Sequence, residues 1–324
     1  MSLHDPNPLF DTKSVNFHNI DQFNEFAKSW DRECRKLKKG NEFEVNLHFI
    51  NAVDFRLVEI NIQSILEQKG NLLKNMRSFL IPCNDHQSFY WRGSIINGNQ
   101  IGIYPLDSEM TVISNSGYNV YVVYASETII INKAAKMQLD WNSLIRDLQK
   151  DHIILDHSKI QSIRQQIRLL FNLKKMPLPE FQSNLLFEEL KNNLLNQLIL
   201  SCKSIPDGNT SDKSNRLRVF HKVRDYVFSN STLEFRMDDL CEYAAASERT
   251  LQYAVKHFTG LTPLEYIKAH KLNFVRESLL KGDATNLKIR ELACNYGFWH
   301  SSQFAIDYKN LFGERPSETL KRRC

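Results

Sequence analysis

The chain has 324 residues, 42% of them hydrophobic, and a formal net charge of +5. This composition excludes collagen-like and intrinsically disordered chains and favours two globular domains. Because the chain has no run of about 18 apolar residues and no charged-then-apolar leader, we expect a cytoplasmic protein with no membrane contact.

The positive charge is concentrated in the last third of the chain. From Arg216 to Cys324 there are 18 Lys and Arg against 13 Asp and Glu, a net +5, whereas residues 1–215 carry 24 of each. An excess on one part of a chain is the footprint of a domain that meets phosphate. The charge therefore favours a nucleic-acid partner for residues 216–324.

The first half opens with a predicted helix over Ile20–Leu37, because Phe23, Phe26, Trp30 and Cys34 recur there at helical spacing. After it, residues 43–131 change to period-two alternation interrupted by turn signals such as Asn-Gly-Asn. The predicted strands are Phe43–Phe49, Phe55–Ile62, Ser78–Ile81, Gln87–Trp91, Gln100–Tyr104, Met110–Ser114 and Asn119–Tyr124. Many short strands predict a β-sandwich or barrel, and hence an α+β chain.

One aromatic cluster is a candidate ligand site. Tyr90 and Trp91, followed by Arg92, could line an apolar pocket with one cationic anchor. The alternative is that these rings are ordinary core.

Enzymatic sites are weakly supported. A metal-dependent cupin needs clustered His and carboxylate ligands, but only His48 and His86 fall on predicted strands, so we expect no metal and no cofactor. A DNA-repair methyltransferase needs a histidine beside its reactive cysteine, and the sequence around Cys83 lacks one. We therefore predict that the chain is not an enzyme.

Helices are predicted over residues 139–202, where apolar residues recur at spacings of three and four. They suit either dimerisation or packing onto the β-rich part. Residues 206–215 have the composition of a flexible linker. This divides the chain into a β-rich sensor and dimerisation domain at 1–205 and a second domain at 216–324.

The second domain contains one pattern written twice at an offset of 53 residues, which indicates an internal repeat. The matched pairs are Leu251/Phe304, Val255/Tyr308, Lys256/Lys309, Gly260/Gly313, Pro263/Pro316 and Glu265/Glu318.

Each copy is typical of a helix-turn-helix. In the first copy, Ser247 is placed to cap a helix whose inner face holds Leu251, Val255 and Phe258, and Gly260 is placed to end it. In the second copy a serine cap is expected at Ser301 or Ser302, with Phe304, Tyr308 and Leu311 inward. A long helix over residues 263–281 is predicted to join the two units.

These two copies resemble the halves of an AraC/XylS-type DNA-binding domain. The first half is carried by Ser247, Arg249, Leu251, Gly260, Thr262, Pro263, Tyr266, Ile267, Leu272, Leu279 and Leu280. The second is carried by Ile289, Glu291, Leu292, Ala293, Gly297, Phe298, Ser302, Phe304, Tyr308, Lys309, Phe312, Gly313 and Pro316. The chain departs from the family at Tyr253 and Ile306, where an arginine is usual.

The resemblance implies a transcriptional regulator that binds promoter or operator DNA. In the first unit the expected DNA-binding residues are Ser247, Arg249, Gln252, Tyr253 and Lys256. In the second unit they are Trp299, His300, Ser302, Gln303, Ile306 and Lys309. Arginine suits guanine and glutamine suits adenine, while the lysines suit phosphates.

The family also implies properties of the whole chain. Its first domain is commonly a cupin-like β-barrel that senses a small molecule, and this layout is similar, with a loose likeness to the ethanolamine-utilisation regulators. The resemblance further implies a homodimeric activator that acts with RNA polymerase and is nucleoid-associated when bound. The alternatives are a protein-interaction scaffold and a regulator that senses no ligand.

Overall fold

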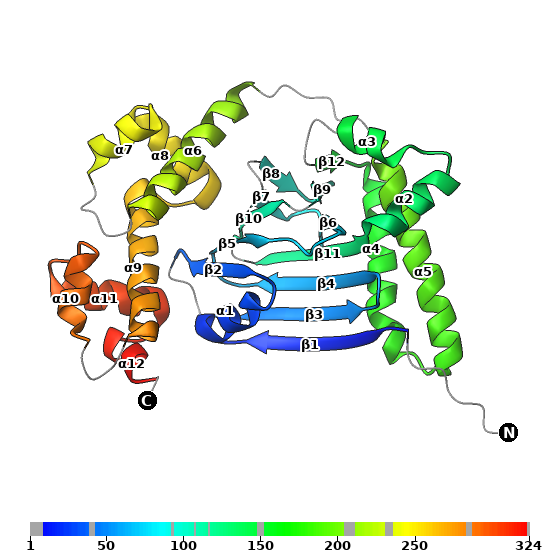
Figure 1. Ribbon diagram of the computed structural model, residues 1–324, viewed down its shortest axis with the longest axis horizontal. Coiled ribbons are helices and arrows are strands. Elements are labelled where there is room, and N and C mark those ends of the chain that lie inside the picture. The colour runs from blue at the N-terminus through cyan, green and yellow to red at the C-terminus, as the bar shows by residue number, and fades with distance from the viewer. Residues whose placement is uncertain are drawn as a thin grey trace.

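A computed structural model describes residues 9–38, 43–91, 94–106, 108–115, 117–147, 152–203, 211–230, 236–282 and 287–322. Within these ranges a β-rich part lies beside an all-helical part (Figure 1). The expected α+β class is therefore confirmed. The first half of the predicted linker, residues 206–210, falls outside the described residues, and helix α6 begins at Ser211, inside the second half.

In the described ranges, the larger sheet has seven strands, and all neighbouring pairs are antiparallel. In spatial order they are β1 (Asp11–Phe17), β3 (Val45–Asn51), β4 (Phe55–Ile62), β11 (Tyr118–Ser126), β6 (Met76–Pro82), β9 (Gln100–Tyr104) and β12 (His152–Ile154). Their alternation places one set of apolar side chains on each face of the sheet.

A second sheet stacks against the first. In spatial order its described strands are β2 (Arg32–Lys36), β5 (Leu66–Asn71), β10 (Glu109–Ile113), β7 (Ser88–Trp91) and β8 (Ser94–Asn97). The space between the sheets is filled from both sides, for example by Val45, Ile60 and Val122 of the larger sheet and Leu66, Trp91 and Val112 of the smaller. Each sheet keeps two edge strands, so the described strands form a sandwich instead of the closed cupin-like barrel that was expected.

The predicted helix over Ile20–Leu37 is wrong in its second half. Helix α1 (Ile20–Lys28) is followed by Asp31 in the left-handed region at φ 54°, which turns the chain. Strand β2 then pairs with β5, with Cys34 opposite Gln68. Pairing with a neighbouring strand thus outweighs the local helical spacing.

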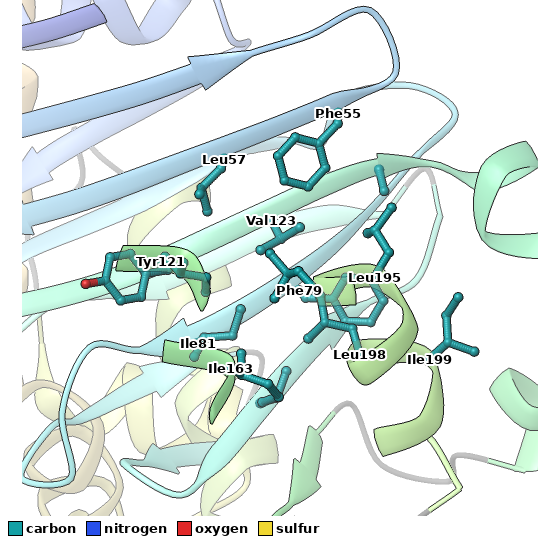
Figure 2. Packing of buried hydrophobic residues seen from close by; sticks show 14 of the residues in the cluster. Phe55, Leu57, Phe79, Ile81, Tyr121, Val123, Ile163, Leu195, Leu198 and Ile199 are labelled. Carbon is teal, nitrogen blue, oxygen red and sulfur yellow. The ribbon is translucent and has the colours of Figure 1, made fainter. Parts of the chain in front are cut away.

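Helices cover the outer face of the larger sheet. The two long ones are α4 (His157–Asn172) and α5 (Glu180–Ser201), and the shorter elements are α2 (Glu127–Lys136), α3 (Trp141–Asp147) and the 3₁₀ turn η1 (Leu173–Lys175). Figure 2 shows Ile163 of α4 and Leu195 and Leu198 of α5 against Phe79 and Val123 of the sheet. Helices are thus present where residues 139–202 predicted them, with β12 inserted between α3 and α4.

The all-helical part is arranged around one long helix. Its elements are α6 (Ser211–Ser229), α7 (Met237–Ala244), α8 (Glu248–Thr259), α9 (Pro263–Lys281), α10 (Ile289–Asn295), α11 (Ser301–Phe312) and α12 (Pro316–Lys321). Helices α6 to α8 lie near one end of α9 and helices α10 to α12 near its other end (Figure 1).

The two parts of the chain meet at a buried carboxylate. Glu67 of β5 is only 2% exposed. It accepts hydrogen bonds from Nε of Arg224 at 2.6 Å and from the hydroxyl of Tyr266 at 2.7 Å, and it lies 2.9 Å from Nε2 of His270. Burial by itself would raise the pKa of Glu67, but Arg224, His270 and Tyr266 together hold that pKa below its ordinary value. A carboxylate from the sheet thus has its counter-charge on α6 and further hydrogen bonds on α9.

A second ion pair lies further along the same junction. Both carboxylate oxygens of Asp21, on α1, accept hydrogen bonds from Arg276 of α9, at 2.8 and 2.7 Å. Arg276 also donates to the hydroxyl of Tyr308, on α11, at 3.2 Å. The β-rich part therefore contacts the spacer helix α9 near Asp21 as well as near Glu67.

We expect Glu67→Gln to lower the free energy of unfolding by about 3–5 kcal/mol, because Arg224 would stay buried without its counter-charge. Urea denaturation would measure the loss. Since folding lowers the pKa of Glu67, the difference should be present above pH 4.5 and shrink as the pH falls below it.

The control is Glu291→Gln, which removes a carboxylate from an exposed pair with Lys288. It should change the stability by no more than about 0.5 kcal/mol. Equal stability of the two variants would contradict the role given to Glu67.

Candidate nucleic-acid interface

The first helix-turn-helix is formed by α7 and α8. Ala245 ends α7 in the left-handed region, with φ 49°. Ser247 then caps α8, since its hydroxyl accepts a hydrogen bond from the backbone N–H of Thr250 at 3.3 Å. Leu251 and Val255 are fully buried on the inner face of α8. The turn and the cap therefore fix which face of α8 is left outward.

The outward face of α8 carries the side chains predicted to bind DNA. Arg249, Gln252, Tyr253 and Lys256 are all exposed, Tyr253 to 59%. The guanidinium of Arg249 lies 5.6 Å from the centroid of the Tyr253 ring. The amide of Gln252 donates to Glu248 at 3.0 Å. This is a polar, solvated face with one aromatic ring.

In the second unit, α11 buries the equivalent inner face, but its N-terminus is capped differently from that of α8. Phe304, Tyr308 and Leu311 are buried, as predicted. The expected serine cap is wrong, because α11 begins at Ser301 and its N-cap is His300, which makes no side-chain capping bond. Ser301 already has helical conformation at the first position of α11 and cannot act as its cap.

The outward face of α11 is also exposed but less polar. Its predicted DNA-binding residues, all exposed, are Trp299, His300, Ser302, Gln303, Ile306 and Lys309. Trp299 is 62% and Ile306 54% exposed, so two large apolar side chains are offered to solvent. Gln303 donates to Asp307, which in turn pairs with Lys268 of α9. The sequence analysis did not predict a role for Lys268, because this residue lies outside both repeated patterns.

The two units match in three dimensions as they do in sequence. Helices α8 and α11 each have 12 residues, and their first residues, Glu248 and Ser301, are 53 positions apart. Gly260 and Gly313 end them in the left-handed region, with φ 70° and 83°. The predicted internal repeat is therefore a structural repeat.

Helix α9 sets the distance between the two units. Its 19 residues, at about 1.5 Å each, span roughly 28 Å. One turn of B-form DNA is about 34 Å. A spacer of this length is of the order needed for two recognition helices to reach successive major grooves.

Three cations on the outward faces are available for phosphates. Among the residues that the structure describes, Arg249, Lys256 and Lys309 form no ion pair with a carboxylate. Side chains of this kind exchange solvent for phosphate without first breaking a salt bridge.

The predicted ligand cluster has a different place in the fold. Tyr90 is 1% exposed and packs its ring against Phe220 and Phe258 of the helical part, at 5.4 and 4.8 Å. Trp91 is fully buried against Tyr104. Arg92 lies outside the described residues. The two rings thus serve packing, as the core alternative held, and Tyr90 belongs to the junction between the two parts.

Cys83, the nucleophile that a repair enzyme would need, is buried, and its burial raises the pKa of the thiol. It is therefore protonated at neutral pH, which is unfavourable for a nucleophile. No group of His, Cys, Asp or Glu that could hold a metal ion is found in the described part of the chain. The described helices also include none that is long and apolar enough to cross a membrane.

The profile of a helix-turn-helix domain family matches residues 240–322, which span both units. A curated relative, the XylDLEGF operon transcriptional activator 2 of Pseudomonas putida, is 38% identical over 109 residues, which cover 32% of this chain and 69% of that protein. The chain belongs to the AraC/XylS family.

A second curated relative and two solved structures are also similar to the chain. The XylDLEGF operon transcriptional activator 1 of Pseudomonas putida is 36% identical over 104 residues, and the match spans 32% of this chain but only 31% of that activator. Among solved structures, a probable AraC family regulator from Rhodopseudomonas palustris is 30% identical over 32% of this chain and 96% of its own, with a TM-score of 0.31. ToxT from Vibrio cholerae is 17% identical, covering 96% of this chain and 98% of its own, with a TM-score of 0.31.

The cap of α8 offers a direct test of the first unit. We expect Ser247→Ala to lower the free energy of unfolding by about 0.5–2 kcal/mol, because the amide of Thr250 would lose its acceptor. Thermal unfolding would measure the change. Ser301→Ala is the matched control, and it should cost less than about 0.5 kcal/mol because Ser301 caps nothing. An equal loss of unfolding free energy in the two variants would contradict the assignment of Ser247, and not Ser301, as a helix cap.

Proposed function

We propose that this AraC/XylS family member is a sequence-specific DNA-binding transcriptional regulator. The observation that carries the proposal is the pair of equivalent helices, α8 and α11, whose outward faces are exposed and whose spacing is set by α9. The net charge of +5 on residues 216–324 agrees with a partner rich in phosphate.

In the first unit, each outward side chain has a proposed role. Arg249 would read a guanine edge and Gln252 an adenine edge in the major groove. Tyr253 would contact a thymine methyl or donate its hydroxyl to a phosphate. Lys256 and the N-terminus of α8 at Ser247 would hold phosphates and set the register.

In the second unit, the contacts would be more apolar. Ile306 and Trp299 would contact thymine methyls or the sugar edges, while Ser302, Gln303 and His300 would supply the hydrogen bonds. Lys309 occupies the position of Lys256 in the repeat and would hold the matching phosphate.

Arg249 and Lys256 make a matched pair for testing, since both are exposed on α8 and each substitution removes one positive charge. We expect Arg249→Ala to weaken binding to the preferred site by about 1–3 kcal/mol and to relax selectivity at one base pair. Lys256→Ala should weaken binding to specific and random duplexes alike and reduce the salt slope by about 1.

Fluorescence anisotropy on a site selected from random DNA, titrated from about 50 to 200 mM salt, would measure both effects. If Arg249→Ala bound its site and random DNA as the unmodified protein does, the base-reading role would be wrong.

Several properties of the whole protein are part of the proposal. The curated relatives named above are described as transcriptional activators. We therefore propose activation, with RNA polymerase as a further partner and a small molecule as effector of the β-rich part.

A homodimer is proposed from the face of α5. Phe181 and Leu185, one helical turn apart, are 67% and 63% exposed. Leu169 of α4 and Leu178, just before α5, add further exposed apolar surface. A second copy of the chain would cover these side chains and place two DNA-binding domains on one operator.

Leu185→Asp tests the dimer. We expect sedimentation equilibrium to show a dimer for the unmodified protein and at least a tenfold weaker association for the variant, since burying the new carboxylate costs more than about 1.4 kcal/mol. Leu264→Asp, at an exposed leucine of α9, should leave the association unchanged. A monomer at tens of micromolar protein, or equal association of both variants, would contradict the proposal.

A further inference from the structure

The outward face of α11 differs from that of α8 at the positions that the repeat makes equivalent. At the offset of 53 residues, Arg249 corresponds to Ser302. Gln252 corresponds to Ala305 in the same way. A guanidinium and an amide, each able to make two hydrogen bonds to one base, are thus replaced by a short hydroxyl and a methyl group. The second unit therefore cannot use arginine–guanine and glutamine–adenine pairs at these positions.

The next equivalent position makes the centre of the α11 face aliphatic. Tyr253 of α8 corresponds to Ile306, which is 54% exposed. Tyr253 carries a hydroxyl and lies beside the guanidinium of Arg249, whereas Ile306 has no polar atom in its side chain. Lys309 is the one basic residue in the sequence of α11, and its proposed partner is a phosphate. An isoleucine is thus left at the middle of the face that would meet the bases.

The amide of Gln303 is held within the protein. It donates a hydrogen bond to the carboxylate of Asp307 at 3.1 Å, and that carboxylate pairs with Lys268 of α9 at 2.5 Å. Gln303 can therefore donate to a base only with its second N–H group or by giving up a bond to a charged acceptor. Apolar contact is the form of base recognition that α11 offers without this cost.

A second large apolar side chain lies just before α11. Phe298 packs its ring against Phe304 of the inner face, with the centroids 5.2 Å apart. Its neighbour Trp299 instead is 62% exposed. The N-terminal residues of a recognition helix are the ones that contact base edges in the major groove. Removing Trp299 and Ile306 from water is favourable where the partner offers apolar groups of its own.

The apolar group that a DNA duplex offers in the major groove is the methyl group on C5 of thymine. Cytosine that is methylated at C5 carries the same group at the same place, whereas uracil and unmodified cytosine lack it. Burying one such methyl group strengthens binding by about fourfold. A side chain without polar atoms can therefore still distinguish between pyrimidines.

We propose that α11 recognises the C5-methyl groups of pyrimidines in the base pairs that it covers, through Ile306 at its centre and Trp299 beside its N-terminus. This specificity rests on the proposed function, since it needs a duplex in contact with α11. It makes the two halves of the DNA site unlike, because α8 selects bases by hydrogen bonds and α11 selects methyl groups. Methylation of a cytosine at C5 in the half-site of α11 thus strengthens binding.

The test uses the full-length protein and a site that it selects from random DNA. The half-site of α8 is the one in which Arg249→Ala relaxes selectivity, and the half-site of α11 lies about one helical turn away. Deoxyuridine then replaces each thymine of the α11 half-site in turn, which removes a methyl group and keeps every hydrogen-bonding group.

Fluorescence anisotropy should show about fourfold weaker binding for at least one of these replacements. At the same position, 5-methylcytosine should bind about fourfold more tightly than cytosine, because it restores the methyl group on another base. A half-site selected without thymine, unchanged affinity for every deoxyuridine, or equal binding of the two cytosines would overturn the proposal.

Two variants assign the effect to side chains. Ile306→Ala and Trp299→Ala each remove an exposed apolar group, and thermal unfolding should show that both variants keep their fold. In at least one of them, deoxyuridine should bind as well as thymine, because the methyl group has lost its partner. Tyr253→Ala, at the equivalent position of α8, is the matched control and should keep the fourfold preference for thymine. An unchanged preference in both α11 variants would overturn the assignment.

The outcomes separate this inference from the proposed function. If the protein selects no site from random DNA, the regulator itself is contradicted and the specificity of α11 with it. If a site is selected and Arg249→Ala relaxes it, but deoxyuridine changes nothing, the regulator stands and methyl recognition by α11 is wrong.

Discussion

Helix α9 is the constraint on which the rest of the structure depends. It must bury side chains on several sides at once, because it packs against α6 and α8 near one end, α10 and α12 near the other, and β2 of the sheet. Tyr266, Leu272, Val275 and Leu279 are all 3% exposed or less. Its apolar surface therefore surrounds much of the helix, and the geometry between the two recognition helices is fixed by packing and not by a flexible loop.

Charged and hydrogen-bonded groups hold the two parts together at their junction, whereas apolar packing holds α9 within the helical part. Within the ranges that the structure describes, the hydrogen-bond partners of the Glu67 carboxylate lie on α6 and α9, so its burial is satisfied in one arrangement of the two parts. A buried ion pair contributes little net stability over apolar packing, but a half-formed pair is costly. We infer that this cluster selects one docked arrangement of the DNA-binding part on the sheet.

Much of this architecture follows from sequence pattern. All seven predicted strands are present, because alternation directly records one buried face. The 53-residue offset predicts helices α8 and α11. Gly260 and Gly313 mark their ends, because a residue in the left-handed region is most often glycine. Where local pattern and pairing disagreed, as at Cys34, pairing determined the result. Strand β5 was missed because its buried residues include Glu67 and Gln68, polar side chains whose partners are distant in sequence.

The site was predictable in part. Outward positions on α8 and α11 follow from helical periodicity, and all of the residues named there are exposed. The missing cap at α11 did not follow, since two adjacent serines and His300 compete for one position. Tyr90 and Trp91 carry no signal that distinguishes a pocket lining from a core.

Methylation interference on DNA selected from a random pool tests the central claim most directly, because it reports which guanines the recognition helices approach in the major groove. Two rigidly spaced helices predict two clusters of interference on one face of the duplex, separated by about one helical turn of 10–10.5 base pairs for each bound domain. A single cluster, or two clusters on opposite faces at half-turn spacing, would contradict the claim that α9 fixes the distance and orientation of α8 and α11.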